Sequence, residues 1–294
     1  MINSKKTRFN FILYSLLLPG ILFYFFILVL PEITSLPFSL YKWSGISNAL
    51  FIGLKNFKFL FKDVIFYKSL INSIILIVEC NTILLVVGFI LAVLLRRRFI
   101  GNDIFKTIIF LPIVIAPMLA ALTWRFMLDP DLGLINNVLK KIHLDFLALK
   151  WIGSGYLSVF AIGIVLCWCT LGVDVVIMLA GARGIPEDFF EVAEIDGASS
   201  FKKAVFITLP MIREQIFICI VLNTMGAFKV FEIVYYLTAG GPAHKTELLS
   251  TYMYKVGFGN YNYGYGSAIS VITIIIGLLL AFITLRLIRE KNTN

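Results

Sequence analysis

The chain has 294 residues, of which 60% are hydrophobic and only 15% are charged, and its formal net charge is +9. Soluble domains carry about a quarter charged residues, so this composition excludes an ordinary soluble protein and indicates a membrane protein. The chain has only two histidines, and its four cysteines all lie in apolar runs, which argues against a metal centre or a disulfide framework. The basic residues are scattered at the ends of hydrophobic stretches, which argues against nucleic acid as a partner.

Six hydrophobic runs are each long enough to cross a lipid bilayer, which takes about 20 helical residues. We therefore predict an all-α integral membrane protein with six transmembrane helices. The predicted spans are Phe11–Leu30, Ser69–Leu95, Ile104–Leu128, Leu157–Ala180, Pro210–Leu237 and Ser267–Ile288. The first run contains Pro19 and lacks a small-residue cleavage pattern, so we expect it to remain in the membrane as an anchor.

Six spans place both termini on one side of the membrane. Lys and Arg are denser on that side, above all in Arg96–Arg98 directly after the second span. Positive residues near span ends favour the cytoplasm, so we predict that both termini and the segment Glu191–Pro210 lie in the cytoplasm. The outer loop Asp129–Tyr156 is predicted to hold turns and then a short amphipathic stretch. We divide the chain into residues 1–68, an N-terminal helix with an extracytoplasmic segment, and residues 69–290, a transmembrane core.

A polar island, Glu191–Pro210, separates the fourth and fifth spans. Its pattern predicts two short cytoplasmic helices: Gly197 is placed to end the first, and Ser199 or Ser200 caps the second, Phe201–Leu209. Isolated helices of fewer than roughly 12–15 residues are marginal in water. We therefore predict that a partner docks on this island.

Several polar or ionisable side chains fall inside the predicted spans: Glu79, Asp174, Asn223, Lys229 and Glu232. A charge near the bilayer centre costs at least ~2.5–3.5 kcal/mol, so it needs a partner or a role. Lys229 and Glu232 are three residues apart, a spacing that allows them to pair on one helix face. For Glu79, Asp174 and Asn223 two interpretations stay open, a polar substrate pathway and hydrogen bonding between helices.

The sequence has no phosphate-binding loop, because the nearest stretch, Gly241–Thr246, lacks the second glycine before Lys-Thr. We therefore expect this chain to bind no cofactor, and if ATP powers transport, another chain binds it. A secondary transporter is the alternative of another class, although the two matching halves with broken helices typical of such proteins are not evident. A membrane enzyme would need a cluster of acid, base or metal-binding residues, which the sequence lacks.

The polar island also carries a motif. Glu191-Val192-Ala193, then Gly197, then Ile207-Thr208-Leu209-Pro210 resembles, in residues and spacing, the EAA loop of permease subunits of binding-protein-dependent ABC importers. Val192 departs from the alanine common in the family. Other stretches resemble the carbohydrate branch of the maltose and glycerol-phosphate type, in its first-permease form. They are Gly53–Phe57, Phe110–Trp124, Gly133–Asn136, Leu179–Pro186 and Phe231–Pro242.

This resemblance implies the type I ABC importer permease fold with a cytoplasmic EAA coupling helix. It implies transport of a sugar or oligosaccharide or, as an alternative, of glycerol phosphate or a polyol. The implied partners are a second related permease, two ATP-binding subunits that hold ATP and Mg²⁺, and an extracytoplasmic solute-binding protein. The implied ATPase-docking residues are Phe189, Phe190, Glu191, Ala193, Ile195, Asp196 and Gly197.

Overall fold

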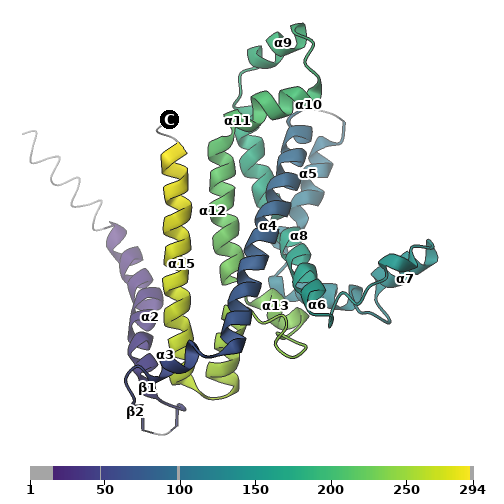
Figure 1. The fold of residues 1–294 in the computed structure, drawn as a ribbon. Helices are drawn as coiled ribbons and strands as arrows, with labels where there is room; N and C mark the ends of the chain where they lie inside the picture. Colours follow the sequence, from purple (N-terminus) through teal and green to yellow (C-terminus); the bar gives the residue numbers. More distant parts are fainter. Residues whose placement is uncertain (1–15, 47, 98–99, 292–294) are drawn as a thin grey trace, which may run out of the picture. The chain divides into compact units, whose positions relative to one another are not determined.

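The computed structural model describes residues 16–46, 48–97 and 100–291 and shows a mainly helical chain with one two-stranded sheet (Figure 1). The chain divides into two compact units. Unit 1 combines Met1–Asp63 with Met253–Ile272, and unit 2 combines Val64–Tyr252 with Thr273–Asn294. The last helix, α15 (Tyr263–Lys291), contributes residues to both units.

Unit 1 begins with a helical stretch, Leu16–Leu40, that is long and apolar enough to span a membrane. The remaining elements of this part are α2 (Leu30–Ser35, inside that stretch), β1 (Tyr41–Lys42), β2 (Leu50–Phe51) and α3 (Lys55–Leu60). The two strands are antiparallel, with Tyr41 opposite Phe51. The buried amide of Asn56 ties α3 to the preceding segment, because its Nδ2 donates hydrogen bonds to the carbonyl oxygens of Ser39 (2.8 Å) and Tyr41 (3.0 Å).

Unit 2 is built on three long helices, α4 (Val64–Arg96), α8 (Tyr156–Arg183) and α12 (Arg213–Lys229). Helices α4 and α8 run in the same direction and α12 runs against them (Figure 1). Apolar side chains of α4 and α8, such as Leu76, Leu84 and Val165, form one buried core. A second core lies nearer the C-terminal ends of α4 and α8 and includes Met178 and Ile212. These cores hold the helices that carry the polar residues predicted from the sequence.

Two predicted spans are not continuous helices. The third consists of α5 (Asn102–Phe110), a 3-10 turn and α6 (Pro117–Met127), and its two arms are bent by 102°. Pro112 and Pro117 lack the backbone N–H that a continuous helix needs, which explains the break. Before the fifth span, the stretch Ser200–Met211 meets α12 at 73°.

The fifth span also ends early. Helix α12 stops at Lys229, and a separate helix, α13 (Glu232–Leu237), follows Val230 and Phe231, so the predicted continuous span Pro210–Leu237 is wrong. In the described residues, four helices are long and apolar enough to cross a membrane, or up to six if each bent pair forms one span. The expected six-span fold corresponds to the second count. Residues 11–15 of the predicted first span lie outside the described residues.

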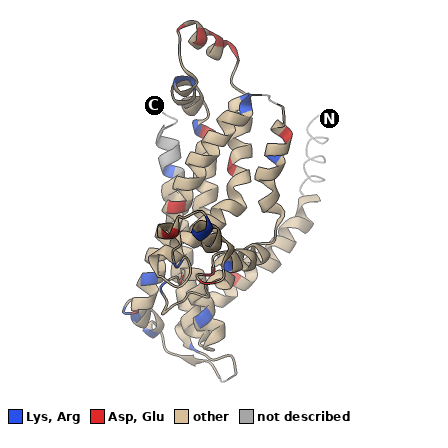
Figure 2. Ribbon diagram, turned by 90° about the vertical axis from the view of Figure 1, so that its right-hand side faces the viewer, with Lys and Arg blue, Asp and Glu red and all other residues tan. Residues whose placement is uncertain are grey.

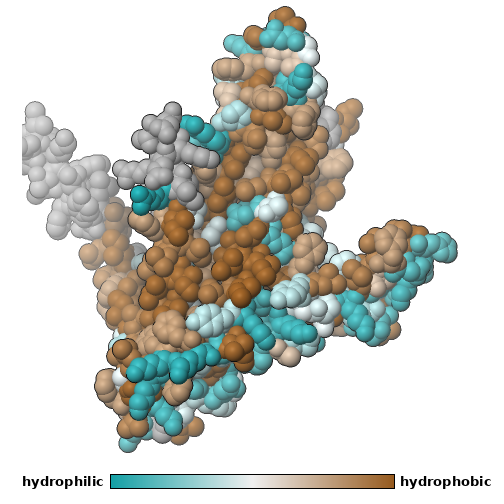
Figure 3. All heavy atoms as spheres, viewed as in Figure 1, coloured by the Kyte–Doolittle hydropathy of each residue, from teal (hydrophilic) through white to brown (hydrophobic). Residues whose placement is uncertain are grey.

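The connecting helices are short. They are α7 (Leu134–Lys141), α9 (Asp188–Ile195), α10 (Ser200–Lys203), α11 (Leu209–Met211) and α14 (Leu249–Tyr254). Helix α7 confirms the amphipathic stretch predicted in the outer loop. Charged residues gather mainly near helix ends and in these connections (Figure 2), while the sides of the long helices are predominantly hydrophobic (Figure 3). Such surfaces suit contact with lipid or with other transmembrane helices.

Candidate functional site

The polar island folds, as predicted, into two short helices joined by a turn. Helix α9 ends at a Schellman motif: the N–H of Ala198 donates to the carbonyl of Ala193 (2.8 Å), and the N–H of Gly197 donates to that of Glu194 (3.0 Å). Gly197 has a φ of +72°, which confirms its predicted role as the residue that ends the helix. Ser199 then caps α10 by accepting a hydrogen bond from the N–H of Lys202 (3.3 Å).

Arg96, the last residue of α4, connects the start of α9 to the long helices α4 and α8. Its guanidinium forms an ion pair with Glu187 (2.5 Å) and lies 3.5 Å from the ring centroid of Phe190. Its Nε also donates to the carbonyl oxygen of Ala182, near the end of α8 (3.2 Å). One side chain therefore contacts α8, the turn after it and α9.

A second ion pair fastens the end of α9. Lys203 of α10 is buried, and its Nζ donates a hydrogen bond to Glu194 Oε1. This hydrogen bond and the positive charge of Lys203 lower the pKa of Glu194, so its carboxylate stays ionised at neutral pH. Because its pKa is lowered, the ionised Glu194 stabilises the folded state at every pH above the usual pKa of a glutamate. This stabilisation is lost as the pH falls through the lowered pKa of Glu194.

The residues expected to dock a partner divide into an exposed and a buried group. Phe189 and Ile195 are 50% and 86% exposed, and Val192 between them is 59% exposed. Three further residues of the predicted set are exposed, namely Glu191, Asp196 and Gly197, while Ala193 is half-buried. Phe190 departs from the expectation, because it is buried in the chain's own core beneath Arg96. The apolar surface that α9 offers is therefore formed by Phe189, Val192 and Ile195.

Three of the predicted polar residues, Glu79, Asp174 and Asn223, lie in a helix seam where α4, α8 and α12 meet. Asn223 of α12 donates a hydrogen bond to Asp174 of α8 (2.8 Å), and both side chains are buried. Asn81 of α4 donates to the hydroxyl of Thr224 on α12 (3.1 Å). The structure thus brings Asp174 and Asn223 together as a pair between helices.

Glu79 lies on the same seam, against the backbone of α8. Its carboxylate occupies the space that a side chain at position 163 would fill, so glycine at that position allows the close approach. Both carboxylate oxygens are buried without a hydrogen-bond partner among the described residues. In a low-dielectric setting such a group is costly unless another group or a solvated path satisfies it.

Lys229 and Glu232 do not form the pair on one helix that their spacing predicted. They lie on either side of the break between α12 and α13, both are exposed, and the described residues form no ion pair between them. A break in the helix changes the direction of the chain, so the three-residue spacing no longer places them on one face.

Sequence reasoning missed several residues whose contacts hold α9 and the loops in place. Arg96 was interpreted only as a topology signal, and Lys203 has no local pattern that predicts its pairing with Glu194. Glu247 is another case: it is fully buried behind the Gly-Gly-Pro turn and accepts a hydrogen bond from Thr251 (2.8 Å). Asn72 of α4 donates to the backbone carbonyl of Glu247 (3.0 Å). The contact of Asn72 with Glu247 joins residues 175 positions apart, which no local spacing indicates.

Comparison with known proteins gives a consistent result. Residues 84–291 match the family model described as "Binding-protein-dependent transport system inner membrane component". The chain is 34% identical to the probable ABC transporter permease protein YurN of Bacillus subtilis (strain 168), with 97% of each chain covered. It is 30% identical to the trehalose/maltose transport system permease protein MalF of Thermococcus litoralis, covering 95% of this chain and 94% of that protein.

A solved structure supports the fold. A chain from the crystal structure of a bacterial ABC transporter involved in the import of the acidic polysaccharide alginate superposes with a TM-score of 0.82 at 23% identity, over 99% of both chains. The family match covers well over half of the sequence and includes α9 with its motif. The chain therefore belongs to the family of inner membrane components of binding-protein-dependent transport systems, the permease subunits of ABC importers.

Proposed function

We propose that this permease moves a sugar or oligosaccharide across the membrane, driven by ATP bound on separate subunits. The observation that carries the proposal is α9: a short exposed helix that presents Phe189, Val192 and Ile195 outward, and that is held to α4 by Arg96 and to α10 by Lys203. An exposed apolar face on a helix too short to be stable alone needs a partner. The sugar assignment is supported by the trehalose/maltose permease among the relatives.

The proposed complex contains this chain, a second related permease, two ATP-binding subunits and an extracytoplasmic solute-binding protein. ATP and Mg²⁺ belong to the ATP-binding subunits. Helix α9 with Asp196 and Gly197 docks on one of these subunits, while residues 69–290 form the transport core. The chain lies in the inner membrane with both termini and α9 in the cytoplasm, an orientation supported by the basic residues at the α9 end of the long helices.

Within this core, we assign different roles to the polar residues. Asp174 and Asn223 satisfy each other inside the helix seam, so they hold α8 to α12. Lys229 and Glu232 are exposed at the α12–α13 break. Charged side chains at membrane depth face water-filled cavities or protein partners rather than lipid, so these two contact the passing substrate. We assign an intermediate role to Glu79. It lies on the helix seam, and its carboxylate is solvated when the substrate passes.

The alternative substrate is glycerol phosphate or another polyol derivative. The specific feature that favours it is Lys229, an exposed ammonium group with no ion-pair partner among the described residues. A phosphate group would complement this charge. A neutral sugar requires no such complement.

The proposal is tested by uptake in cells with and without the gene for this chain. Labelled trehalose, maltose, maltotriose and glycerol 3-phosphate are supplied separately, with ATP depletion in one arm and a protonophore that spares ATP in another. We expect at least one saccharide to require the chain and to lose uptake on ATP depletion alone. Chain-dependent uptake of glycerol 3-phosphate without any saccharide would establish the alternative, and dependence on the proton gradient would contradict an ABC importer.

A further inference from the structure

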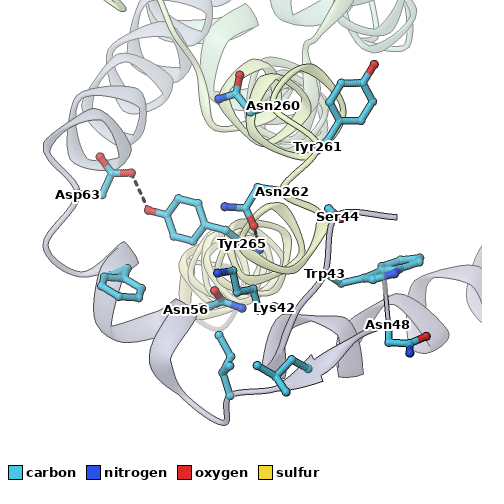
Figure 4. A pocket seen from close by; sticks show the side chains of 13 residues that line it. Lys42, Trp43, Ser44, Asn48, Asn56, Asp63, Asn260, Tyr261, Asn262 and Tyr265 are labelled. Carbon is cyan, nitrogen blue, oxygen red and sulfur yellow. Dashed lines mark hydrogen bonds between the residues drawn. The ribbon is translucent and has the colours of Figure 1, made fainter. Parts of the chain in front are cut away.

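Unit 1 contains a pocket that shares no lining residue with α9 or the helix seam. It has a volume of about 800 Å³ and is formed by the segment around β1 and α3 together with the turn that precedes α15 (Figure 4). All of its lining residues belong to unit 1. The volume lies within the range of about 300–1,000 Å³ that is typical of small-ligand sites.

The lining combines apolar surface with several uncharged hydrogen-bonding groups. Asn56, Asn260 and Asn262 contribute amides, and Tyr265 contributes a hydroxyl that donates to Asp63 (2.6 Å; Figure 4). Amides offer donors and acceptors at the same time. This combination suits a ligand that is itself covered with hydroxyl groups.

The pocket is held in shape by its own hydrogen bonds. The two bonds from Asn56 to the backbone fix the wall near β1. Asn262 Oδ1 accepts from the N–H of Tyr265 (3.3 Å) and so fixes the start of α15. Trp43 is stacked on Phe38, with ring centroids 4.7 Å apart, and forms a rigid part of the lining. Preorganised polar groups lose little entropy when they bind a ligand.

Tyr261, at the edge of the pocket, has an unusual backbone. Its φ is +53°, in the left-handed region, although it is not a glycine, and its side chain is 62% exposed. Bulky residues rarely adopt this conformation, and strain of this kind is concentrated at functional sites. The turn thus holds the Tyr261 ring at the edge of the pocket, although the left-handed backbone conformation of Tyr261 is energetically unfavourable. An aromatic face can stack on the apolar face of a sugar ring.

Other ligand classes fit less well. The described residues contain no cluster of three or more metal-ligating side chains, and Asp63 already accepts a hydrogen bond from Tyr265. An anion would need more positive charge than the single Lys42, which shares the pocket with Asp63. An apolar ligand would remove the polar groups of the lining from water without offering new hydrogen bonds, which is costly.

We propose that this pocket of unit 1 is a binding site for a neutral saccharide, in which Tyr261 stacks on a sugar ring while Asn260 and the neighbouring amides bind its hydroxyls. The proposal rests on the proposed sugar transport and adds a contact site outside the transmembrane helices. Under the orientation given above, the site lies on the outer side, where sugar arrives. It therefore holds sugar before sugar enters the membrane.

Photolabelling tests the site on the intact permease–ATPase complex in lipid nanodiscs, without the solute-binding protein. The probes are maltotriose, cellotriose and diacetylchitobiose, each with a diazirine at the reducing end, and an oligoglucuronate of the same length. We expect at least one neutral probe to label residues 42–63 or 260–265, in competition with its unlabelled form. Labelling elsewhere only, or stronger labelling by the oligoglucuronate, would overturn the proposal.

Variants make the result specific. Asn260→Ala combined with Tyr261→Ala is expected to reduce labelling about fivefold or more, the size of effect that follows from loss of one stacked ring and one hydrogen bond. Tyr156→Ala, at a tyrosine that is 79% exposed and lies outside this pocket, is the matched control and is expected to label normally. Equal melting temperatures exclude unfolding as the cause, and unchanged labelling of a folded double variant would contradict the site.

A parallel uptake measurement separates the two proposals. If cells need the chain for uptake of a saccharide whose probe leaves the pocket unlabelled, the pocket is wrong and the transport function stands. If uptake of every saccharide is the same with and without the chain, the proposed function itself is wrong.

Discussion

At the scale of single residues, Gly197 determines how α9 ends. Its φ of +72° closes the Schellman motif, and a Cβ at this position would meet no atom within 4 Å. Substitution is therefore penalised by backbone strain alone, about 1–2 kcal/mol for an L-residue in the left-handed region. Sequence spacing was sufficient to predict this conformation, because helix-ending glycines follow a local rule.

We predict that Gly197→Val misdirects the turn after α9 and uncouples ATP hydrolysis from transport. The measurement compares substrate uptake with ATPase activity in reconstituted vesicles, where uptake should fall while hydrolysis persists. Gly53→Val is the control, since Gly53 also has a positive φ (+59°) and open space around it but lies in unit 1. Equal coupling in the Gly197→Val and Gly53→Val variants would contradict the prediction.

Gly163 has the opposite environment, because a Cβ there would collide with the carboxylate of Glu79. We predict that Gly163→Ala lowers the free energy of unfolding by about 1 kcal/mol, the low end of the usual cost of overpacking, because the obstructing atoms are the end of a flexible side chain that can shift. Adding Glu79→Ala should restore much of the loss by removing the obstructing group. Thermal unfolding in detergent measures both effects.

Gly226→Ala provides the matched control for this pair. Gly226 also lies in a long helix, α12, but a Cβ there would meet no atom within 4 Å. Its substitution should be neutral or slightly stabilising, since alanine is the better helix former. A similar loss in Gly226→Ala and Gly163→Ala would show that close packing on Glu79 is not the cause.

At the scale of elements, α4 connects distant features of unit 2. Asn72 hydrogen-bonds to the backbone of the loop that follows the Gly-Gly-Pro turn, and Arg96 contacts the start of α9. These two residues are 24 positions apart, which is about 36 Å along a helix. Arg96 is therefore placed to transmit movement of α9 to α4.

We predict that Arg96→Met and Glu187→Gln each reduce ATP-dependent uptake, and that the double variant is no worse than Arg96→Met alone. Because Glu187 is 69% exposed, solvent screening limits this pair to about 0.2–1 kcal/mol of stability. Its effect should therefore be seen in coupling more than in the melting temperature. Lys106→Met, which removes the ion pair with the exposed Asp103, is the control. Independent, additive losses in the double variant would argue against a shared contact.

The elements also show where sequence reasoning reaches its limit. Hydrophobic runs located the four long apolar helices and the two bent pairs approximately, because burial in lipid imposes length and composition. They did not reveal the 102° and 73° bends or the break between Lys229 and Glu232. Apolar composition is the same on both sides of a bend, so only tertiary packing and the prolines determine where the helix turns.

At the scale of the whole molecule, the motif predicted the family, and the family match to residues 84–291 confirmed it. Prediction was weaker for contacts between distant segments, such as Asn72 with Glu247 or Asp174 with Asn223. Nothing in the local sequence distinguishes a paired from an unpaired polar residue in a span. The pairing depends on how α4, α8 and α12 are aligned along one another, and only the tertiary packing determines this alignment.

The central claim is that α9 transmits ATP-driven movement from another subunit. The most direct measurement places a photo-crosslinking amino acid at Ile195, which is 86% exposed, and separately at Tyr156, which is 79% exposed and outside α9. We predict that only Ile195 crosslinks to an ATP-binding subunit, and that Glu191→Lys weakens this crosslink together with ATP-dependent uptake. Full uptake by a complex in which Ile195 contacts no ATP-binding subunit would contradict the account.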